Sequence, residues 1–236
     1  MTWETSELAR YYEATHHNQR VHAAKFPMAF DVLTEIEACF ALLGKNLVNP
    51  EVVLTGTFLL QSGNQFKAAT GHAMAGALQP AFQDSRGCLE QAGHALLLKQ
   101  KPELLEIFVS RHVDEKSMKA QKSAFHPTRV ANAVGVVDQD LHKIYVDLYQ
   151  LTIDFGGHPN PHGIFSGAKL SDDGLRTPTL CIEERPLLHT IKGVAQVGLT
   201  ALHVLQHVFK PKFEILGVRQ RLENLRRAQI APDIGI

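Results

Sequence analysis

The chain of 236 residues has few of the features that reveal a protein's class at first sight. Lysine plus arginine equal aspartate plus glutamate at 24 each, so the formal net charge is zero. A neutral chain has no overall positive field to attract nucleic acid. Its three cysteines, Cys39, Cys88 and Cys181, are isolated and have no C-x-x-C spacing. This pattern favours a reducing compartment over a disulfide scaffold, so we expect a cytoplasmic protein.

Long hydrophobic runs and familiar catalytic motifs are also missing. The longest apolar window, Val52–Leu60, is too short to span a bilayer, so we expect no membrane partner. The first residues, MTWETSELAR, lack the basic and apolar regions of a signal peptide. The glycine patterns of dinucleotide and P-loop sites, the zinc-protease motif and the serine-hydrolase elbow are absent. No repeat or linker divides the chain, and we expect a single domain over residues 1–236.

Apolar residues recur at three- and four-residue steps through most of the chain, which is the period of amphipathic helices. The sequence therefore predicts an all-α bundle of about seven helices. Pro80 either kinks the central helix or belongs to its first turn. A small β-hairpin is expected at about 164–182, around a Ser-Asp-Asp-Gly turn. The expected helices cover 7–25, 27–44, 50 to just beyond 61, a central segment within 68–98, 103–122, 139–155, 186–208 and 214–229.

The segment Ala68–Leu98 is poor in charge, because Asp84, Arg86 and Glu90 are its only formally charged residues. Such a segment is typical of a buried central helix. Arg86, Glu90 and His94 follow at steps of four and should project from one face. A charge held away from water must be paired or bind something. We take Arg86 and Glu90 as candidate catalytic residues and His94 as a candidate ligand-binding residue. An ordinary structural ion pair explains the first two equally well.

The most distinctive loop is the run His158-Pro159-Asn160-Pro161-His162, which follows a predicted helix. Two prolines stiffen it, and polar loops placed directly after helices often serve a site. We take His158 as a candidate general acid or base, with Asn160 as its hydrogen-bonding partner. His162 is a candidate ligand-binding residue. The alternative is a rigid turn whose side chains cap helix ends.

These two regions are expected to form one site. A guanidinium has five N–H groups, and a polar turn offers carbonyl and amide acceptors for them. We therefore expect the turn Gly156–Gly163 to fold back over the central helix, next to Arg86 and Glu90. The alternative is a loop that faces solvent and only leads into the hairpin.

Histidine is abundant, with 13 residues, but its spacing is a weak signal for metal. His203 and His207 are four residues apart on the predicted helix 186–208, and His189 lies near the same stripe. Imidazoles at this spacing can share a zinc ion, although ordinary core or surface histidines are commoner. We assign no metal ligand. The basic segment 209–227 could face phosphate, but a solvated face or a dimer contact is favoured.

The stretches Arg86-Gly87-Cys88-Leu89-Glu90 and Gly157-His158-Pro159-Asn160 resemble a loose group of bacterial helical proteins similar to HEPN-type bundles. That group has an R-x-x-x-E on a buried helix and a later helix that ends in a polar turn with histidine. The resemblance covers about residues 50–210. Because the group includes toxin and defence ribonucleases, it implies RNA-directed activity or an inactive relative. HEPN nucleases use R-x(4–6)-H, a spacing that Arg10 has here with His16 and with His17, on the first helix.

Two functions follow from these observations. The first is a cytoplasmic HEPN-like bundle with a polar pocket and RNA-directed activity, as a ribonuclease or an inactive relative. In a ribonuclease, a histidine would act as general acid or base and an arginine would stabilise the charge of the transition state. The second is a non-enzymatic bundle that binds a small ligand or a metal and acts as a dimeric regulator. The expected partners are RNA or a small ligand, and a second copy of the chain. No particular cofactor is indicated.

Overall fold

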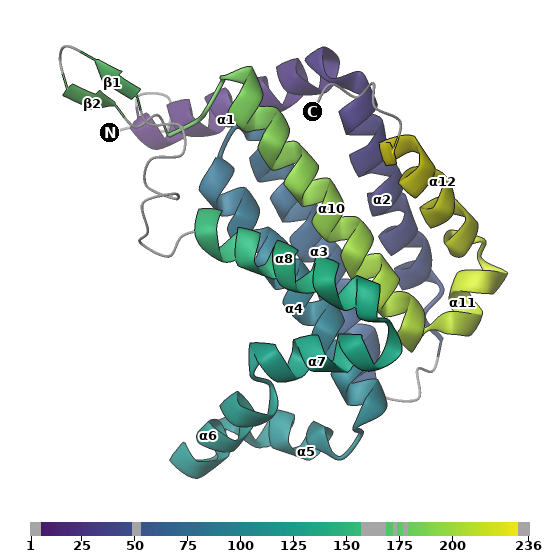
Figure 1. The fold of residues 1–236 in the computed structure, drawn as a ribbon. Coiled ribbons are helices and arrows are strands. Elements are labelled where there is room, and N and C mark those ends of the chain that lie inside the picture. Colours follow the sequence, from purple (N-terminus) through teal and green to yellow (C-terminus); the bar gives the residue numbers. More distant parts are fainter. Residues whose placement is uncertain (1–5, 49–52, 157–168, 172–173, 177–178, 231–236) are drawn as a thin grey trace.

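The computed structural model describes residues 6–48, 53–156, 169–171, 174–176 and 179–230 (Figure 1). Most of these residues are helical, so the all-α class is confirmed. The strands β1 (Lys169–Ser171) and β2 (Gly174–Arg176) are antiparallel, with Lys169 opposite Arg176. The helices are α1 Glu7–Lys25, α2 Pro27–Lys45, α3 Val53–Ala75, α4 Leu78–Gln100, α5 Leu104–Val109, the 3-10 turn η2 Ser110–His112, α6 Glu115–Ala124, α7 Pro127–Val137, α8 Gln139–Phe155, α10 Glu184–Val208, α11 Lys210–Ile215 and α12 Val218–Ile230.

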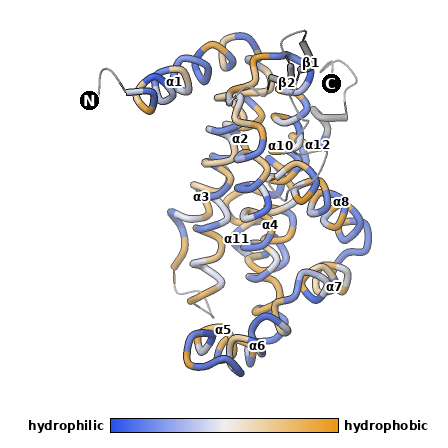
Figure 2. The backbone as a smooth tube through the Cα atoms, turned by 90° about the vertical axis from the view of Figure 1, so that its left-hand side faces the viewer, coloured by the Kyte–Doolittle hydropathy of each residue, from blue (hydrophilic) through white to orange (hydrophobic). Residues whose placement is uncertain are grey.

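Helix α4 is the centre of the bundle. It packs against α3, α10, α7 and α8, while α2 lies against α3 and α10 (Figure 1). In Figure 2, hydrophobic and hydrophilic residues alternate along most of the helices, as expected for helices with one face in the core. The small buried residues of α4 let its neighbours come close. Its buried residues are Ala81, Phe82, Ser85, Cys88, Leu89, Ala92, Gly93, Ala95, Leu96, Leu97 and Leu98.

The helix before α4 is α3, which ends at Ala75, so the end expected just beyond residue 61 is wrong. α3 continues through Gly63, where Phe40 packs closely against the helix: an added Cβ at Gly63 would lie 3.1 Å from the Cβ of Phe40. Gly76 has a φ of 85°, a conformation that glycine adopts easily. Its carbonyl accepts a hydrogen bond from the backbone N–H of Cys181 at 2.8 Å, and a Cβ at Gly76 would overlap the Cys181 carbonyl.

Other helix boundaries depend on caps. Pro80 is the third residue of α4, so it lies in the first turn, where its missing N–H does no harm. The helix expected over the next segment is divided, because the side chain of Asp114 accepts a hydrogen bond from the N–H of Ser117 and begins α6. His126 and Pro127 begin α7, a helix that was not among those expected from the sequence. The described residues therefore form more helices than the seven expected.

The basic C-terminal segment is divided at Gly217, which has a φ of 67°. Arg219 forms an ion pair with Glu214 at 2.8 Å, and Arg221 reaches Glu35 on α2 at 3.1 Å. The protein thus uses part of the positive charge of this segment internally. That arrangement agrees with a solvated, structural role for the segment. None of the helices in the described ranges is both long and apolar enough to cross a membrane.

Candidate functional site

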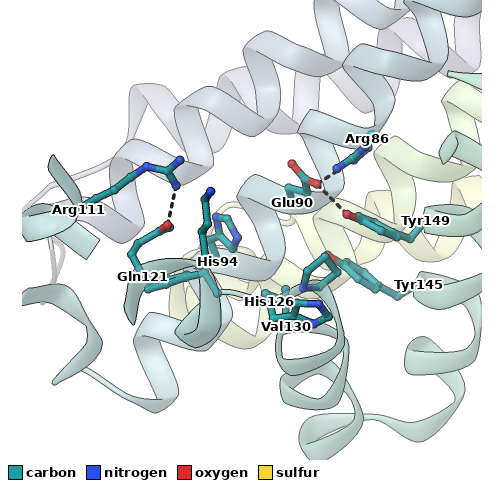
Figure 3. A pocket seen from close by; sticks show the side chains of 12 residues that line it. Arg86, Glu90, His94, Arg111, Gln121, His126, Val130, Tyr145 and Tyr149 are labelled. Carbon is teal, nitrogen blue, oxygen red and sulfur yellow. Dashed lines mark hydrogen bonds and ion pairs between the residues drawn. The ribbon is translucent and has the colours of Figure 1, made fainter. Parts of the chain in front are cut away.

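A pocket of about 390 Å³ lies beside α4, between this helix and the segment from η2 to α8 (Figure 3). Its size is near the lower end of the range for small-molecule sites. All three members of the predicted Arg86, Glu90 and His94 face line this pocket, as expected for residues one helical turn apart. The complete lining is Arg86, Glu90, His94, Arg111, Gln121, Lys122, Phe125, His126, Pro127, Val130, Tyr145 and Tyr149.

Glu90 is the centre of a network at one end of the pocket. The Nε of Arg86 donates to Oε1 of Glu90 at 2.9 Å, and the hydroxyl of Tyr149 donates to the same oxygen at 2.8 Å. The guanidinium of Arg86 lies 5.5 Å from the centre of the Tyr149 ring, within the range of a cation–π contact. The side chains of Arg86 and Glu90 are 35% and 34% exposed. The expectation of a buried ion pair is therefore wrong, because the pocket gives water access to both groups.

Burial and the neighbouring groups shift the pKa values of Tyr149 and Arg86. Burial, followed by the negative charge of Glu90, raises the pKa of Tyr149 to about 12. Burial opposes the charge on Arg86, but the hydrogen bond to Glu90 and the charge of Glu90 outweigh it and raise the pKa of Arg86. Near neutral pH, Tyr149 therefore remains a hydrogen-bond donor and Arg86 remains a cation.

Two tyrosines from α8 reach α4 because they are one helical turn apart. The hydroxyl of Tyr145 donates to the carbonyl of Leu89 at 3.2 Å, and burial raises the pKa of Tyr145 above its usual range. The rings of Tyr145 and Tyr149 are nearly parallel, with centroids 6.4 Å apart. Gly93 makes this approach feasible: an added Cβ would lie 2.3 Å from Val130 and 2.7 Å from the Tyr145 hydroxyl. The wall formed by α7 and α8 thus packs directly on the α4 backbone.

His94 lies between the two ends of the pocket (Figure 3). Its ring meets Phe58, Phe108 and Phe125 edge to face, with centroid distances of 5.7, 6.4 and 5.1 Å. Burial lowers the pKa of His94 more than the charge of Glu90 raises it, so the imidazole is neutral near pH 7. Within the described ranges, neither ring nitrogen has a hydrogen-bond partner. A neutral imidazole of this kind can donate to and accept from a bound molecule.

The other end of the pocket is cationic. Arg111 of η2 donates from its NH1 to Oε1 of Gln121 on α6 at 2.5 Å, and Lys122 is the next residue. In the part of the chain that the structure describes, neither Arg111 nor Lys122 forms an ion pair with a carboxylate. His126, the N-cap of α7, accepts the N–H of Thr128 at Nδ1, at 3.3 Å. Among the described residues, its Nε2 has no hydrogen-bond partner.

The residues predicted from the sequence did not include Tyr149, Arg111, Lys122 or His126. Tyr149 had a signal, since a tyrosine four residues after Tyr145 on an apolar stripe usually needs a partner for its hydroxyl. His126 precedes a proline and reads as a helix end, although the same pattern can begin a helix. Arg111 and Lys122 had no local signal, because the turn between α5 and α6 is what directs them to the pocket.

Three predicted site residues, His158, Asn160 and His162, lie outside the described residues. Only the first residue of their turn can be placed. The backbone of Gly156 lies against α4, where an added Cβ would be 3.1 Å from the carbonyl carbon of Phe82. The turn therefore begins next to the central helix. Its approach to Arg86 and Glu90 remains a prediction.

The R-x(4–6)-H pattern formed by Arg10 with His16 and His17 lies on α1, which contributes no residue to the pocket lining described above. Arg10 forms an exposed ion pair with Glu7 at 2.8 Å. His16 and His17 are exposed on the same helix. The pattern and the pocket are therefore separate features of the molecule.

The histidines of α10 lie outside the pocket lining as well. The ring of His189 packs edge to face with Phe155, with centroids 5.8 Å apart. Burial lowers the pKa of His203 and of His207. Among the described residues, no group of three or more histidine, cysteine, aspartate or glutamate side chains is placed to hold a metal ion.

No protein-family model, curated protein or solved structure matched the chain. The geometry and charge of the pocket are therefore the support for a function.

Proposed function

We propose that this protein is a ligand-binding helical bundle whose pocket takes a small anionic molecule. This is the small-ligand form of the second function expected from the sequence. Charge is the observation that carries the proposal. Arg86, Arg111 and Lys122 are the basic residues of the lining, whereas Glu90 is its one carboxylate and is already bonded to Arg86. Counted over these formally charged residues alone, the lining has a net charge of plus two, which a bound anion would offset.

The shape and lining of the pocket support the same proposal. Phe125, Pro127 and Val130 supply apolar surface, and charged or polar side chains make up most of the rest of the lining. A concave space that combines apolar surface with directed polar groups is the usual form of a small-molecule site. A volume of about 390 Å³ fits a small acid with an apolar or uncharged body.

Thermal denaturation with added anions tests the proposal. Inorganic phosphate, pyrophosphate and small carboxylates are compared with sodium chloride at equal ionic strength. A bound anion raises the melting temperature in a concentration-dependent way, because it binds only the folded state. We expect Arg111→Ala and Lys122→Ala to reduce this rise. Arg219→Ala is the matched control, since Arg219 is half-exposed on α12 and pairs with Glu214. An equal rise in all variants, or no rise beyond that with sodium chloride, contradicts the proposal.

An RNA-directed activity is the second candidate, as the HEPN-like resemblance implies. It is supported by the imidazoles of His94 and His126 in a cationic pocket, because proton transfer in phosphodiester cleavage uses such groups. End-labelled RNA incubated with the protein and a metal chelator tests it. We expect cleavage that His126→Ala or His158→Ala removes. Loss of cleavage in His16→Ala would instead place the activity on α1. Intact RNA rejects the candidate.

We also propose a second copy of the chain as a partner, and a cytoplasmic location. Support for the dimer comes from large hydrophobic side chains exposed on α1 and α2, among them Leu8, Val21, Met28 and Phe30. Support for the location comes from the three cysteines, which are buried and not joined in disulfides. Light scattering after size-exclusion chromatography should give the mass of two chains. The mass of one chain at micromolar concentration contradicts the dimer.

A further inference from the structure

The two ends of the pocket differ in the groups they present: one has a carboxylate that Arg86 binds through one oxygen, and the other has Arg111 and Lys122. In Figure 3, the Arg86–Glu90 pair lies on one side of His94, and the Arg111–Gln121 pair lies on the other. We infer that the ligand is bipolar, with an amino group that binds Glu90 and an anionic group that binds Arg111 and Lys122. The inference rests on the proposed function and adds the second, donor-bearing end of the ligand.

The Glu90 end requires a donor from the ligand. Both hydrogen bonds to this carboxylate use Oε1, and within the described ranges no donor reaches Oε2. The side chain is one-third exposed, so water can solvate Oε2 in the empty pocket. A ligand that covers Oε2 without supplying a hydrogen-bond donor would leave a desolvated carboxylate oxygen unpaired, which is unfavourable. An amino group avoids this loss and adds a charge-assisted hydrogen bond.

The opposite end requires an acceptor. Gln121 holds Arg111 through NH1 alone, so the rest of the guanidinium fork can bind a second group. Lys122 adds a point charge beside it. Phosphate and carboxylate are the two common anions that match a guanidinium fork. Both are therefore sources of the same anionic chemistry, and the experiment separates them.

Between the two ends, His94 favours a polar body over a purely hydrocarbon one. Its neutral ring has no hydrogen-bond partner among the described residues, and it can both donate to and accept from a hydroxyl group. An amino sugar phosphate carries all three features: an amine, hydroxyl groups and an anion. A chain-like amino acid carries the amine and a carboxylate, and it is the carboxylate-bearing compound in the experiment below.

Isothermal titration calorimetry on the full chain tests the inference with two matched pairs. Glucosamine phosphate is compared with glucose phosphate, both phosphorylated on the terminal hydroxyl. ε-Aminocaproate is compared with ε-hydroxycaproate. In each pair, a hydroxyl replaces the amine. We expect the amine to bind about tenfold more tightly in at least one pair, which is the size of effect that a hydrogen bond to a charged group has. The pair that shows the preference identifies the anion.

Two variants show which end of the pocket binds which group of the ligand. Glu90→Gln should abolish the preference for the amine, because the amide is uncharged. Lys122→Ala should weaken both members of a pair to the same extent, because it acts on the anion; this side chain is exposed, so the fold should be retained. The comparison within each pair uses the unaltered protein and is valid even if Glu90→Gln does not fold.

The outcomes separate the inference from the proposed function. Equal binding of amine and hydroxyl, still weakened by Lys122→Ala, overturns the bipolar ligand and leaves the anion pocket standing. Binding of inorganic phosphate without binding of any of the four compounds has the same meaning. If neither the four compounds nor inorganic phosphate binds, the proposed function fails together with the inference.

Discussion

Tyr149 of α8 donates its hydroxyl hydrogen to the Glu90 oxygen that Arg86 also binds. The two residues are 59 positions apart, so this bond of 2.8 Å ties α8 to α4 at one end of the pocket. The two donors converge on one carboxylate oxygen and leave the other oxygen for the pocket. Tyr149 therefore determines which part of Glu90 a ligand would meet.

The ionisation of Tyr149 should report this contact. Burial and the nearby charge of Glu90 raise its pKa to about 12, compared with about 10 for an ordinary tyrosine. The folded state then holds the proton more tightly than the unfolded state. The free energy of unfolding should fall as pH rises from about 10 to about 12, and below that range this group contributes no pH dependence. The tyrosinate absorbance of the wild type minus that of Tyr149→Phe should show a step near pH 12. A step near pH 10 would contradict the contact.

Arg86→Ala should cost about 1 kcal/mol of unfolding free energy, because water screens a pair that is one-third exposed. A truly buried pair would lose on the order of 3–5 kcal/mol when one partner is removed. The observed exposures of 35% and 34% for Arg86 and Glu90 argue for the smaller value. Urea denaturation measures it, with Arg226→Ala as the exposed control. A loss above about 3 kcal/mol, or one no larger than that of Arg226→Ala, would show that this account of the pair is wrong.

The helices were predictable where local geometry decides them. α1 begins where expected because Ser6 is a true N-cap, whose hydroxyl accepts from the N–H of Ala9 at 3.1 Å. The end of α3 was not predictable, because it depends on distant residues. Gly63 and Gly76 look alike in sequence, but Phe40 packs on the first and the Cys181 backbone bonds to the second. Only the folded chain shows which glycine ends a helix.

The candidate site was predictable to the same extent. Steps of four residues place Arg86, Glu90 and His94 on one face in any helix, so their common pocket wall followed from the sequence. The exposure of the pair did not follow, since a charge-poor segment says nothing about a pocket beside it. Arg111 and Lys122 come from a part of the chain whose course depends on the Asp114 cap and on tertiary packing, which periodicity cannot predict.

The thiols should be unreactive in the native protein. Burial is the main cause that raises the pKa of Cys39 and of Cys88 to about 12, and Cys181 is also buried. Because the thiolate is the reactive form, a disulfide reagent such as Ellman's reagent should react slowly at mildly alkaline pH and titrate three thiols after denaturation. The slow reaction of the native protein should proceed at the rate at which the protein unfolds. A fast native reaction of one thiol would show that its burial is incomplete in solution.

Gly93→Ala should destabilise the protein by about 1–3 kcal/mol, the usual cost of overpacking a core. The new methyl group would lie 2.3 Å from Cγ1 of Val130 and 2.7 Å from the hydroxyl of Tyr145. Tyr145 is only 2% exposed and bonded to a carbonyl of α4, so it cannot move aside without losing that bond. The gain of about 1 kcal/mol that alanine brings to a helix offsets only part of this cost. Urea denaturation measures the net change.

Gly71→Ala is the matched control, because Gly71 also lies within a helix but has room for a methyl group. Its added Cβ would meet only Nε2 of Gln19, at 3.6 Å, which is ordinary contact. The free energy of unfolding of this variant should stay the same or rise by up to about 1 kcal/mol. Val130 and Tyr145 line the pocket, so Gly93→Ala should also weaken the protection that phosphate gives against heat, whereas Gly71→Ala should leave it unchanged. Equal stability of the two variants would mean that α7 and α8 do not pack on Gly93. The wall that gives the pocket its shape would then be misplaced.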